Sequence, residues 1–155
     1  MDTTFLKQAI ALAVENVQTG NGGPFAAIIT KENKIIAQGV NVVTTCNDPT
    51  AHAEVSAIRN ACSALNTFQL EGCTLYSSCE PCPMCLGAIY WARIKRLVFA
   101  ANKEQAHKAG FSDAFIYQEM ELPYDQRQII TEHITLPQDN EPFELWEQSN
   151  AKVEY

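Results

Sequence analysis

The sequence contains no apolar run approaching the roughly 20 residues that a membrane-spanning helix needs. Its first 20 residues also lack the basic segment followed by an apolar one that marks a secretory signal. We therefore expect a cytoplasmic protein that has no membrane partner. Basic residues are few, with 11 Lys and Arg against 18 Asp and Glu and a net charge of −7. A nucleic-acid binder normally presents a basic surface, so we expect no nucleic-acid partner.

The acidic excess is concentrated at one end of the chain. Residues 111–155 hold ten acidic side chains against Arg127 and Lys152, a net of −8, so residues 1–110 carry 9 basic and 8 acidic side chains, a net of +1. No repeat, low-complexity tract or linker interrupts the 155 residues, of which 46% are hydrophobic. We expect residues 1–155 to form a single domain, with 142–155 as a C-terminal segment.

Apolar periodicity predicts an α/β protein. Helical spacing or composition predicts helices over 3–18, 50–65, 83–94 and 141–151, the second of them capped by Thr50. Short apolar runs predict strands over 22–30, 34–41 and 73–78 and a buried strand over 95–101, the first two joined as a hairpin. This alternation implies a central sheet with helices on both faces.

The six cysteines do not suggest a disulfide framework, because a cytoplasmic protein keeps its thiols reduced. Cys82 and Cys85 have the C-x-x-C spacing, which places both on one face at the start of a helix, where the helix dipole favours thiolates. No thioredoxin-like context supports a redox pair, and the fourth ligand of a structural zinc site is absent. The others (Cys46, Cys62, Cys73 and Cys79) are interpreted as buried or loop thiols.

A second motif, "PTAHAEV", supplies His52 and Glu54. One His and two Cys give three protein ligands and leave the fourth position open to water, which is the composition of a catalytic zinc site. H-x-E together with P-C-x-x-C is the signature of the zinc deaminases, in which the Glu is a general acid/base and not a ligand. The motifs therefore predict that zinc activates a water that attacks an amine-bearing ring carbon, and that Glu54 moves the proton to the leaving amine.

The chain resembles the cytidine deaminase-like superfamily and, within it, the bacterial guanine deaminases. The resemblance covers essentially the whole chain, through "GGPF", "NDPTAHAEV", "SCEPCPMCLGAIYWAR", "AGFSDAFIY" and the terminal "EY". The zinc motifs are shared by all branches, whereas "AGFSDAFIY" and "KVEY" point to guanine. The resemblance implies a three-layer α/β/α fold around a mixed sheet of about five strands. It also implies hydrolysis of guanine to xanthine and ammonia, by homodimers that exchange their C-terminal segments.

The resemblance also implies a role for individual residues, each of which has a structural alternative. His52, Cys82 and Cys85 would bind Zn²⁺, and Glu54 would transfer protons. Asn41 and the backbone of Ala53 would hold the purine, Phe25 and Trp91 would contact its ring, Asp113 its far edge, and Tyr155 would cover the site. Alternatively, Phe25 and Trp91 are core residues, Asn41 ends a strand, Asp113 caps a helix and Tyr155 is a frayed end.

The chemistry of guanine favours Asp113 independently. Guanine presents two adjacent donors, N1–H and the 2-amino group, which one carboxylate accepts together, and adenine and cytosine lack this pair. Three alternative functions stay open at this stage. A tRNA adenosine deaminase is disfavoured by the acidic C-terminal third, a cytosine deaminase is harder to exclude by charge, and a non-catalytic zinc-stabilised module leaves Glu54 without a use.

Overall fold

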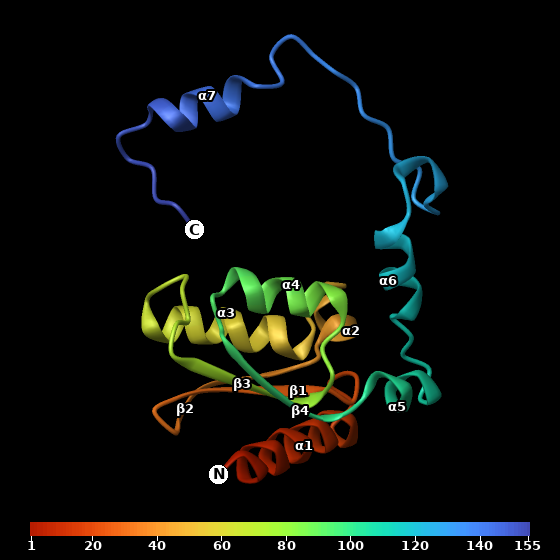
Figure 1. Cartoon of the computed structure of the whole chain (residues 1–155). Coiled ribbons are helices and arrows are strands. Elements are labelled where there is room, and N and C mark those ends of the chain that lie inside the picture. The colour runs from red at the N-terminus through yellow and green to blue at the C-terminus, as the bar shows by residue number, and fades with distance from the viewer. The chain divides into compact units, whose positions relative to one another are not determined.

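The structure, a computed structural model, describes residues 1–155 and divides them into two units, 1–113 and 114–155. The first unit contains α1 (Asp2–Gln18), β1 (Ala26–Lys31), β2 (Lys34–Val40), α2 (Val43–Cys46), α3 (Ala53–Leu65), β3 (Cys73–Cys79), α4 (Pro83–Trp91), β4 (Arg96–Ala101) and α5 (Lys103–Lys108), as Figure 1 shows. The second contains α6 (Ala114–Glu121), the 3₁₀ turn η1 (Tyr124–Gln126) and α7 (Glu141–Gln148). None of the helices is both long enough and apolar enough to span a bilayer.

The strands form one mixed sheet in the order β2-β1-β3-β4. β1 pairs antiparallel with both β2 and β3, and β3 pairs parallel with β4. The sheet therefore has four strands and not the expected five, because the chain after β4 forms only helices, turns and irregular segments. β4 is consequently an edge strand. Its side chains are half-buried or exposed, which corrects the prediction of a buried strand over 95–101.

Helices cover both faces of the sheet, which confirms the three-layer α/β/α fold (Figure 1). α1 lies on one face, against β1, β3 and β4, and α3 lies on the other, against β2 and β1. Alternate residues of β1 point to the two faces. Ile28 joins Phe5, Ala9 and Tyr76 beneath α1, whereas the neighbouring Ile29 belongs to the core cluster that contains Ala57 of α3. The sheet is thus buried on both sides at its centre.

The approach of α3 to β2 depends on a glycine. A Cβ atom added to Gly39 would collide with the backbone oxygen of Ala53 and the backbone nitrogen of Ala57. A residue without a side chain at position 39 therefore lets the first turns of α3 lie directly on the edge strand of the sheet. α3 begins at Ala53 with His52 as its N-cap, so the prediction that Thr50 caps this helix was wrong. The Thr50 hydroxyl instead donates to Asp48.

The second unit has no buried residue. Its apolar side chains are exposed, including Ile129 at 77%, Ile130 at 88% and Phe143 at 66%. Leaving such groups in water forfeits roughly 1.5–3 kcal/mol for each large side chain. The unit therefore has no core of its own and lacks the burial that an independently stable domain requires.

Candidate metal centre and catalytic site

The N-termini of two helices bring the predicted metal ligands together. His52 is the N-cap of α3, Cys82 is the N-cap of α4, and Cys85 follows in the first turn of α4. Pro83 occupies the start of α4, where a missing N–H leaves no bond unmade. The Nδ1 atom of His52 lies 3.5 Å from the sulfur of Cys82 and 3.5 Å from that of Cys85. All three ligand atoms lie within 4.8 Å of one another.

This geometry fits a tetrahedral zinc ion. Zn–S bonds of about 2.3 Å and Zn–N bonds of about 2.0–2.1 Å at the tetrahedral angle place nitrogen and sulfur roughly 3.6 Å apart. The observed 3.5 Å separations agree with that spacing. Cys79, although close in sequence, is not part of the cluster, and its thiol is directed to the backbone oxygen of Asn102 at 3.8 Å. Three ligands leave a fourth position for water, as in catalytic zinc sites.

The electrostatics of the three ligands are interdependent. A hydrogen bond from the Cys85 thiol, together with His52, lowers the pKa of Cys82 to about 4, although burial opposes this shift. The same hydrogen bond, and then burial, raises the pKa of Cys85. The bond to Cys82 raises the pKa of His52. The metal-free cluster therefore retains protons that binding of a cation must displace, so the affinity for a metal rises with pH.

Glu54 is buried beside this cluster. Its side chain is 6% exposed, and its Oε1 accepts a hydrogen bond of 3.3 Å from the hydroxyl of Ser77 on β3. Burial raises the pKa of Glu54, and the hydrogen bonds that its carboxylate accepts oppose this only in part. A carboxyl group with a raised pKa both accepts and releases a proton more readily near neutral pH, which suits a general acid/base.

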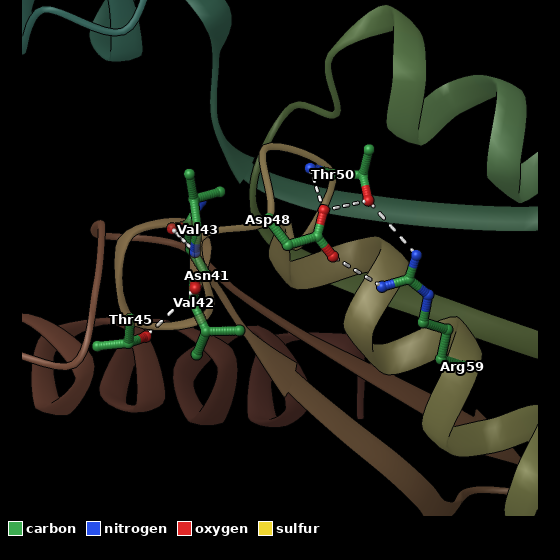
Figure 2. A network of polar contacts seen from close by, with 7 residues as sticks. All are labelled: Asn41, Val42, Val43, Thr45, Asp48, Thr50 and Arg59. Carbon is green, nitrogen blue, oxygen red and sulfur yellow. Dashed lines mark hydrogen bonds and ion pairs between the residues drawn. The ribbon is translucent and has the colours of Figure 1, made fainter.

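Asn41 lies at the end of β2 with its amide oxygen occupied. The Oδ1 atom accepts from the backbone N–H of Val43 at 3.3 Å (Figure 2). It also accepts from the backbone N–H of Gly23 at 3.4 Å. Its own backbone oxygen accepts a hydrogen bond of 2.8 Å from the side chain of Asn16. These contacts fix the amide, and its Nδ2 donor has no partner within the chain. Asn41 therefore ends a strand, and it also presents a hydrogen-bond donor.

Phe25 joins the segment that carries Asp113 to the core. The ring of Phe25 packs against the main cluster, and Phe111 meets it edge-to-face with ring centroids 4.9 Å apart. Asp113, two residues after Phe111, is half-buried. Burial above all, but also the carboxylates of Glu54, Glu80 and Asp113, raises the pKa of Cys79.

The other predicted residues are placed differently. Ala53 is fully buried as the first residue of α3, a helix that has no side-chain cap. Trp91 is 65% exposed in the chain, so the alternative that it is a core residue was wrong. It is the last residue of α4, roughly nine residues and 13 Å along the helix from Cys82. Tyr155 belongs to the second unit and is 69% exposed. The substrate roles of Ala53, Trp91 and Tyr155 stay predictions.

Ser77 and Phe111 contribute to the site but were not predicted from the sequence. Ser77 lies in the predicted strand 73–78, and Phe111 lies in the segment "AGFSDAFIY". The period-2 alternation of a strand identifies the face that Ser77 occupies, but only the packing of α3 shows that Glu54 lies there.

A surface cavity with a volume of about 450 Å³, lined by Gln38, Gly39, Arg59 and others, includes none of these site residues.

Comparisons with known proteins agree with this site. Residues 1–101 match the family described as the cytidine and deoxycytidylate deaminase zinc-binding region. The chain belongs to this family of zinc-binding deaminases. Within it, the chain is 55% identical to the guanine deaminase of Bacillus subtilis (strain 168) over 152 residues, which is 98% of this chain and 97% of the relative.

Two solved structures of guanine deaminases, and one more distant relative by sequence, are also similar to this chain. A crystal structure of the Bacillus subtilis guanine deaminase superposes with a TM-score of 0.97, covering 99% of this chain and 98% of that one. A guanine deaminase from Nitrosomonas europaea is 32% identical, with a TM-score of 0.67 over 71% of this chain and 64% of that one. The tRNA-specific adenosine deaminase of Aquifex aeolicus is 47% identical, but over only 63% of this chain and 64% of the relative.

Proposed function

We propose that this protein hydrolyses guanine to xanthine and ammonia at a zinc ion held by His52, Cys82 and Cys85. The observation that carries the proposal is the similarity to a guanine deaminase over 98% of the chain, including the acidic last third, whereas the tRNA adenosine deaminase matches 63%. The ligand cluster beside the buried Glu54 supplies the corresponding chemistry. The six free thiols suit the reducing cytoplasm in which we place the protein.

Glu54 carries out the proton transfers of the reaction. Zinc, when bound, supplies a water that ionises near neutral pH. Glu54 would accept one proton from the attacking water, while the oxygen of that water forms a bond to C2 of guanine. Glu54 then delivers a proton to the 2-amino nitrogen, the C2–N bond breaks, and ammonia leaves. One water is consumed for each guanine, and the carboxylate returns to its starting state.

Asn41 and Asp113 would provide complementary polar groups for guanine. The free Nδ2 donor of Asn41 suits an acceptor on the purine, because Oδ1 is already held by two backbone N–H groups. The carboxylate of Asp113 suits the adjacent N1–H and 2-amino donors. Phe25 offers an aromatic edge to the ring, and the backbone of Ala53, Trp91 and Tyr155 complete the proposed contacts. A base without the donor pair leaves the Asp113 carboxylate unpaired, at a penalty of about 1–3 kcal/mol.

The decisive experiment measures ammonia release from a panel of free bases by the purified, zinc-loaded protein. We expect turnover of guanine and little turnover of adenine or cytosine. Glu54→Gln should retain zinc and lose several orders of magnitude in turnover. Glu80→Gln is the matched control and should stay active, because it removes the charge of a half-buried carboxylate that accepts from the backbone N–H of Lys103. Preference for cytosine, activity only on tRNA, or no release from any base would each reject the assignment.

We further propose a homodimer in which the second unit covers a partner subunit. The support is the set of exposed apolar side chains in residues 114–155, among them Leu145 at 61%, Trp146 at 44% and Val153 at 59%. α4 also exposes Tyr90 at 72% and Trp91 at 65%. A reciprocal exchange of C-terminal segments in a twofold dimer would bury such surfaces in pairs.

The dimer and the role of the C-terminus are tested separately. Sedimentation of the full chain should give the mass of two chains, and removal of residues 142–155 should give monomers. Removal of only residues 151–155 should preserve zinc content and the dimer but severely reduce guanine turnover, because Tyr155 would no longer exclude water from the purine. Unchanged turnover in the shorter deletion would contradict the covering role of Tyr155, and a monomeric full chain would contradict the exchange.

A further inference from the structure

The loop between β2 and α3, residues 41–52, ends at the metal ligand His52. Its two ends are joined by a hydrogen bond of 3.1 Å from the backbone N–H of Val42 to the carbonyl of Ala51. The loop contains α2 and then Asn47, whose φ of 50° turns the chain toward Asp48. The loop contains no glycine and one proline, Pro49. Side-chain hydrogen bonds therefore help to fix the conformation of its backbone.

Asp48 makes three of these side-chain hydrogen bonds. Its Oδ1 atom accepts from the backbone N–H of Thr50 at 2.8 Å and from the hydroxyl of Thr50 at 2.7 Å (Figure 2). Its Oδ2 atom pairs with Arg59 of α3 at 3.4 Å, and Arg59 also donates to the Thr50 hydroxyl at 3.4 Å. The bonds from Thr50 lower the pKa of Asp48, so the carboxylate is charged at neutral pH.

The turn made by Asp48 leads directly to the metal ligand. The backbone oxygen of Asp48 accepts from the N–H of Ala51 at 3.1 Å, and the backbone oxygen of Thr50 accepts from the N–H of His52 at 2.8 Å. The His52 backbone is therefore fixed by the same turn that the Asp48 side chain closes. From there its ring needs only the side-chain torsions to reach the two sulfurs.

The ring of His52 makes no hydrogen bond within the chain other than those to the two cysteines. A metal-binding histidine usually donates its second ring nitrogen to a carboxylate or carbonyl, which orients the ring. In His52 the Nδ1 atom faces Cys82 and Cys85, and the Nε2 atom has no hydrogen-bond partner within the chain. The orientation that an outer hydrogen bond would normally supply must therefore come from the backbone of the loop.

We propose that Asp48 is a positioning residue for His52, and that its turn with Thr50 holds the imidazole where it can share a metal ion with Cys82 and Cys85. The ion pair with Arg59 fastens this turn to α3 and is the smaller contribution, because it is exposed and exposed pairs are weak. The proposal rests on the zinc site of the proposed function. It does not depend on which base is deaminated.

Zinc affinity, measured by competition with a colorimetric chelator, is the test. Asp48→Ala should weaken zinc binding about 10–100-fold, as loss of an outer-shell partner does. Asp48→Asn keeps an oxygen acceptor for the Thr50 N–H and should stay near the parent. Asp48→Glu keeps the charge, but its longer side chain no longer closes the turn, so it should resemble Asp48→Ala. The visible spectrum of the Co²⁺-loaded variants should change in the same order.

Other outcomes would overturn the proposal. Parent-like zinc affinity in Asp48→Ala would show that the turn does not position His52. If Asp48→Ala fails to fold, the zinc affinities of Asp48→Asn and Asp48→Glu still test the proposal. Tighter zinc binding by Asp48→Glu than by Asp48→Asn would show that the charge at position 48 matters and not the turn. Asp2→Ala, which removes a distant exposed ion pair, is the stability control. If Asp2→Ala loses as much zinc affinity as Asp48→Ala, the proposal that Asp48 positions His52 is rejected. A parent that binds zinc but releases no ammonia would reject the proposed function and leave this test intact.

Discussion

The hydroxyl of Ser77, on β3, donates a hydrogen bond of 3.3 Å to the carboxylate of Glu54, on α3. Both side chains are buried, at 2% and 6% exposed. The same Ser77 oxygen accepts from the backbone N–H of Cys79 at 3.4 Å, which directs the hydroxyl proton to Glu54. The sheet thus holds the proposed acid/base residue, Glu54, from one side while α3 carries it from the other.

Ser77→Ala should reduce guanine turnover without loss of zinc. Removing the hydrogen bond frees one carboxylate oxygen, and a contribution of about 1 kcal/mol corresponds to about a fivefold decrease in kcat. Ser77→Thr, which restores the hydroxyl, should recover most of the activity. The control is Ser78→Ala, because Ser78 accepts from the backbone N–H of Ala26 and does not contact Glu54. A larger loss of kcat in Ser78→Ala than in Ser77→Ala would contradict this role.

Cys85→Ala should abolish zinc binding and, with it, activity. Two ligands do not hold a catalytic zinc ion at the affinity that three provide. Cys79→Ala is the matched control, because its thiol lies outside the ligand cluster although it is buried in the same segment. Metal analysis of both purified variants decides, and stoichiometric zinc in Cys85→Ala, or its absence from folded Cys79→Ala, would mean that the ligands are misassigned.

Asp113→Asn should reduce kcat/KM for guanine, because an amide replaces the double acceptor. The loss should correspond to about 1–3 kcal/mol of transition-state stabilisation. The loss should be smaller for 2-aminopurine, which carries the amino group but has no N1–H donor. Zinc content should not change. Asp113 also directly precedes α6, so a structural role as a helix cap is the alternative. Equal fractional losses for both substrates, with lower thermal stability, would indicate the cap.

Asp2→Asn should lower stability in a pH-dependent manner. The carboxylate of Asp2 accepts from Arg96 at 2.7 and 3.0 Å and from the Tyr76 hydroxyl at 2.7 Å, which ties the start of α1 to β3 and β4. These bonds, Arg96 first, lower the pKa of Asp2 from 3.8 to about 2. A lowered folded-state pKa contributes stability above pH 3.8 that is lost as the pH falls toward 2.

Urea unfolding of the metal-free parent and Asp2→Asn between pH 2 and 7 checks this prediction. The difference in midpoint should be constant near neutrality and should shrink as the pH falls from 3.8 toward 2, because Asp2 of the parent loses its charge first in the unfolded chain and then in the folded chain. Asp139→Asn removes a carboxylate that makes no side-chain hydrogen bond and should show no such dependence. A difference between Asp2→Asn and parent that is as large at pH 2 as at pH 7 would show that the effect is not electrostatic.

The sequence by itself determined most of the local structure of this protein, and it predicted the chemistry of the candidate site. His52, Glu54, Cys82 and Cys85 were identified from two short motifs, since zinc ligation requires these residue types in a limited set of spacings. The three-layer fold followed from the alternation of helix and strand periods, because each period fixes which side chains share a face. The confirmed boundaries of α1 and β2 lie within one residue of those predicted, as local patterns allow.

Tertiary structure decided what depends on residues distant in sequence. The strand count and the exposure of β4 depend on which segments find pairing partners, and periodicity does not encode pairing. The N-cap of α3 is His52 and not the predicted Thr50, because the Thr50 hydroxyl donates to Asp48. Capping propensities alone do not show which of these two uses Thr50 takes. Ser77 joined Glu54, and Phe111 joined Phe25, across 23 and 86 residues of sequence. Motifs select chemistry through residue type, whereas the orientation of each group is set by contacts that exist only after the chain has folded.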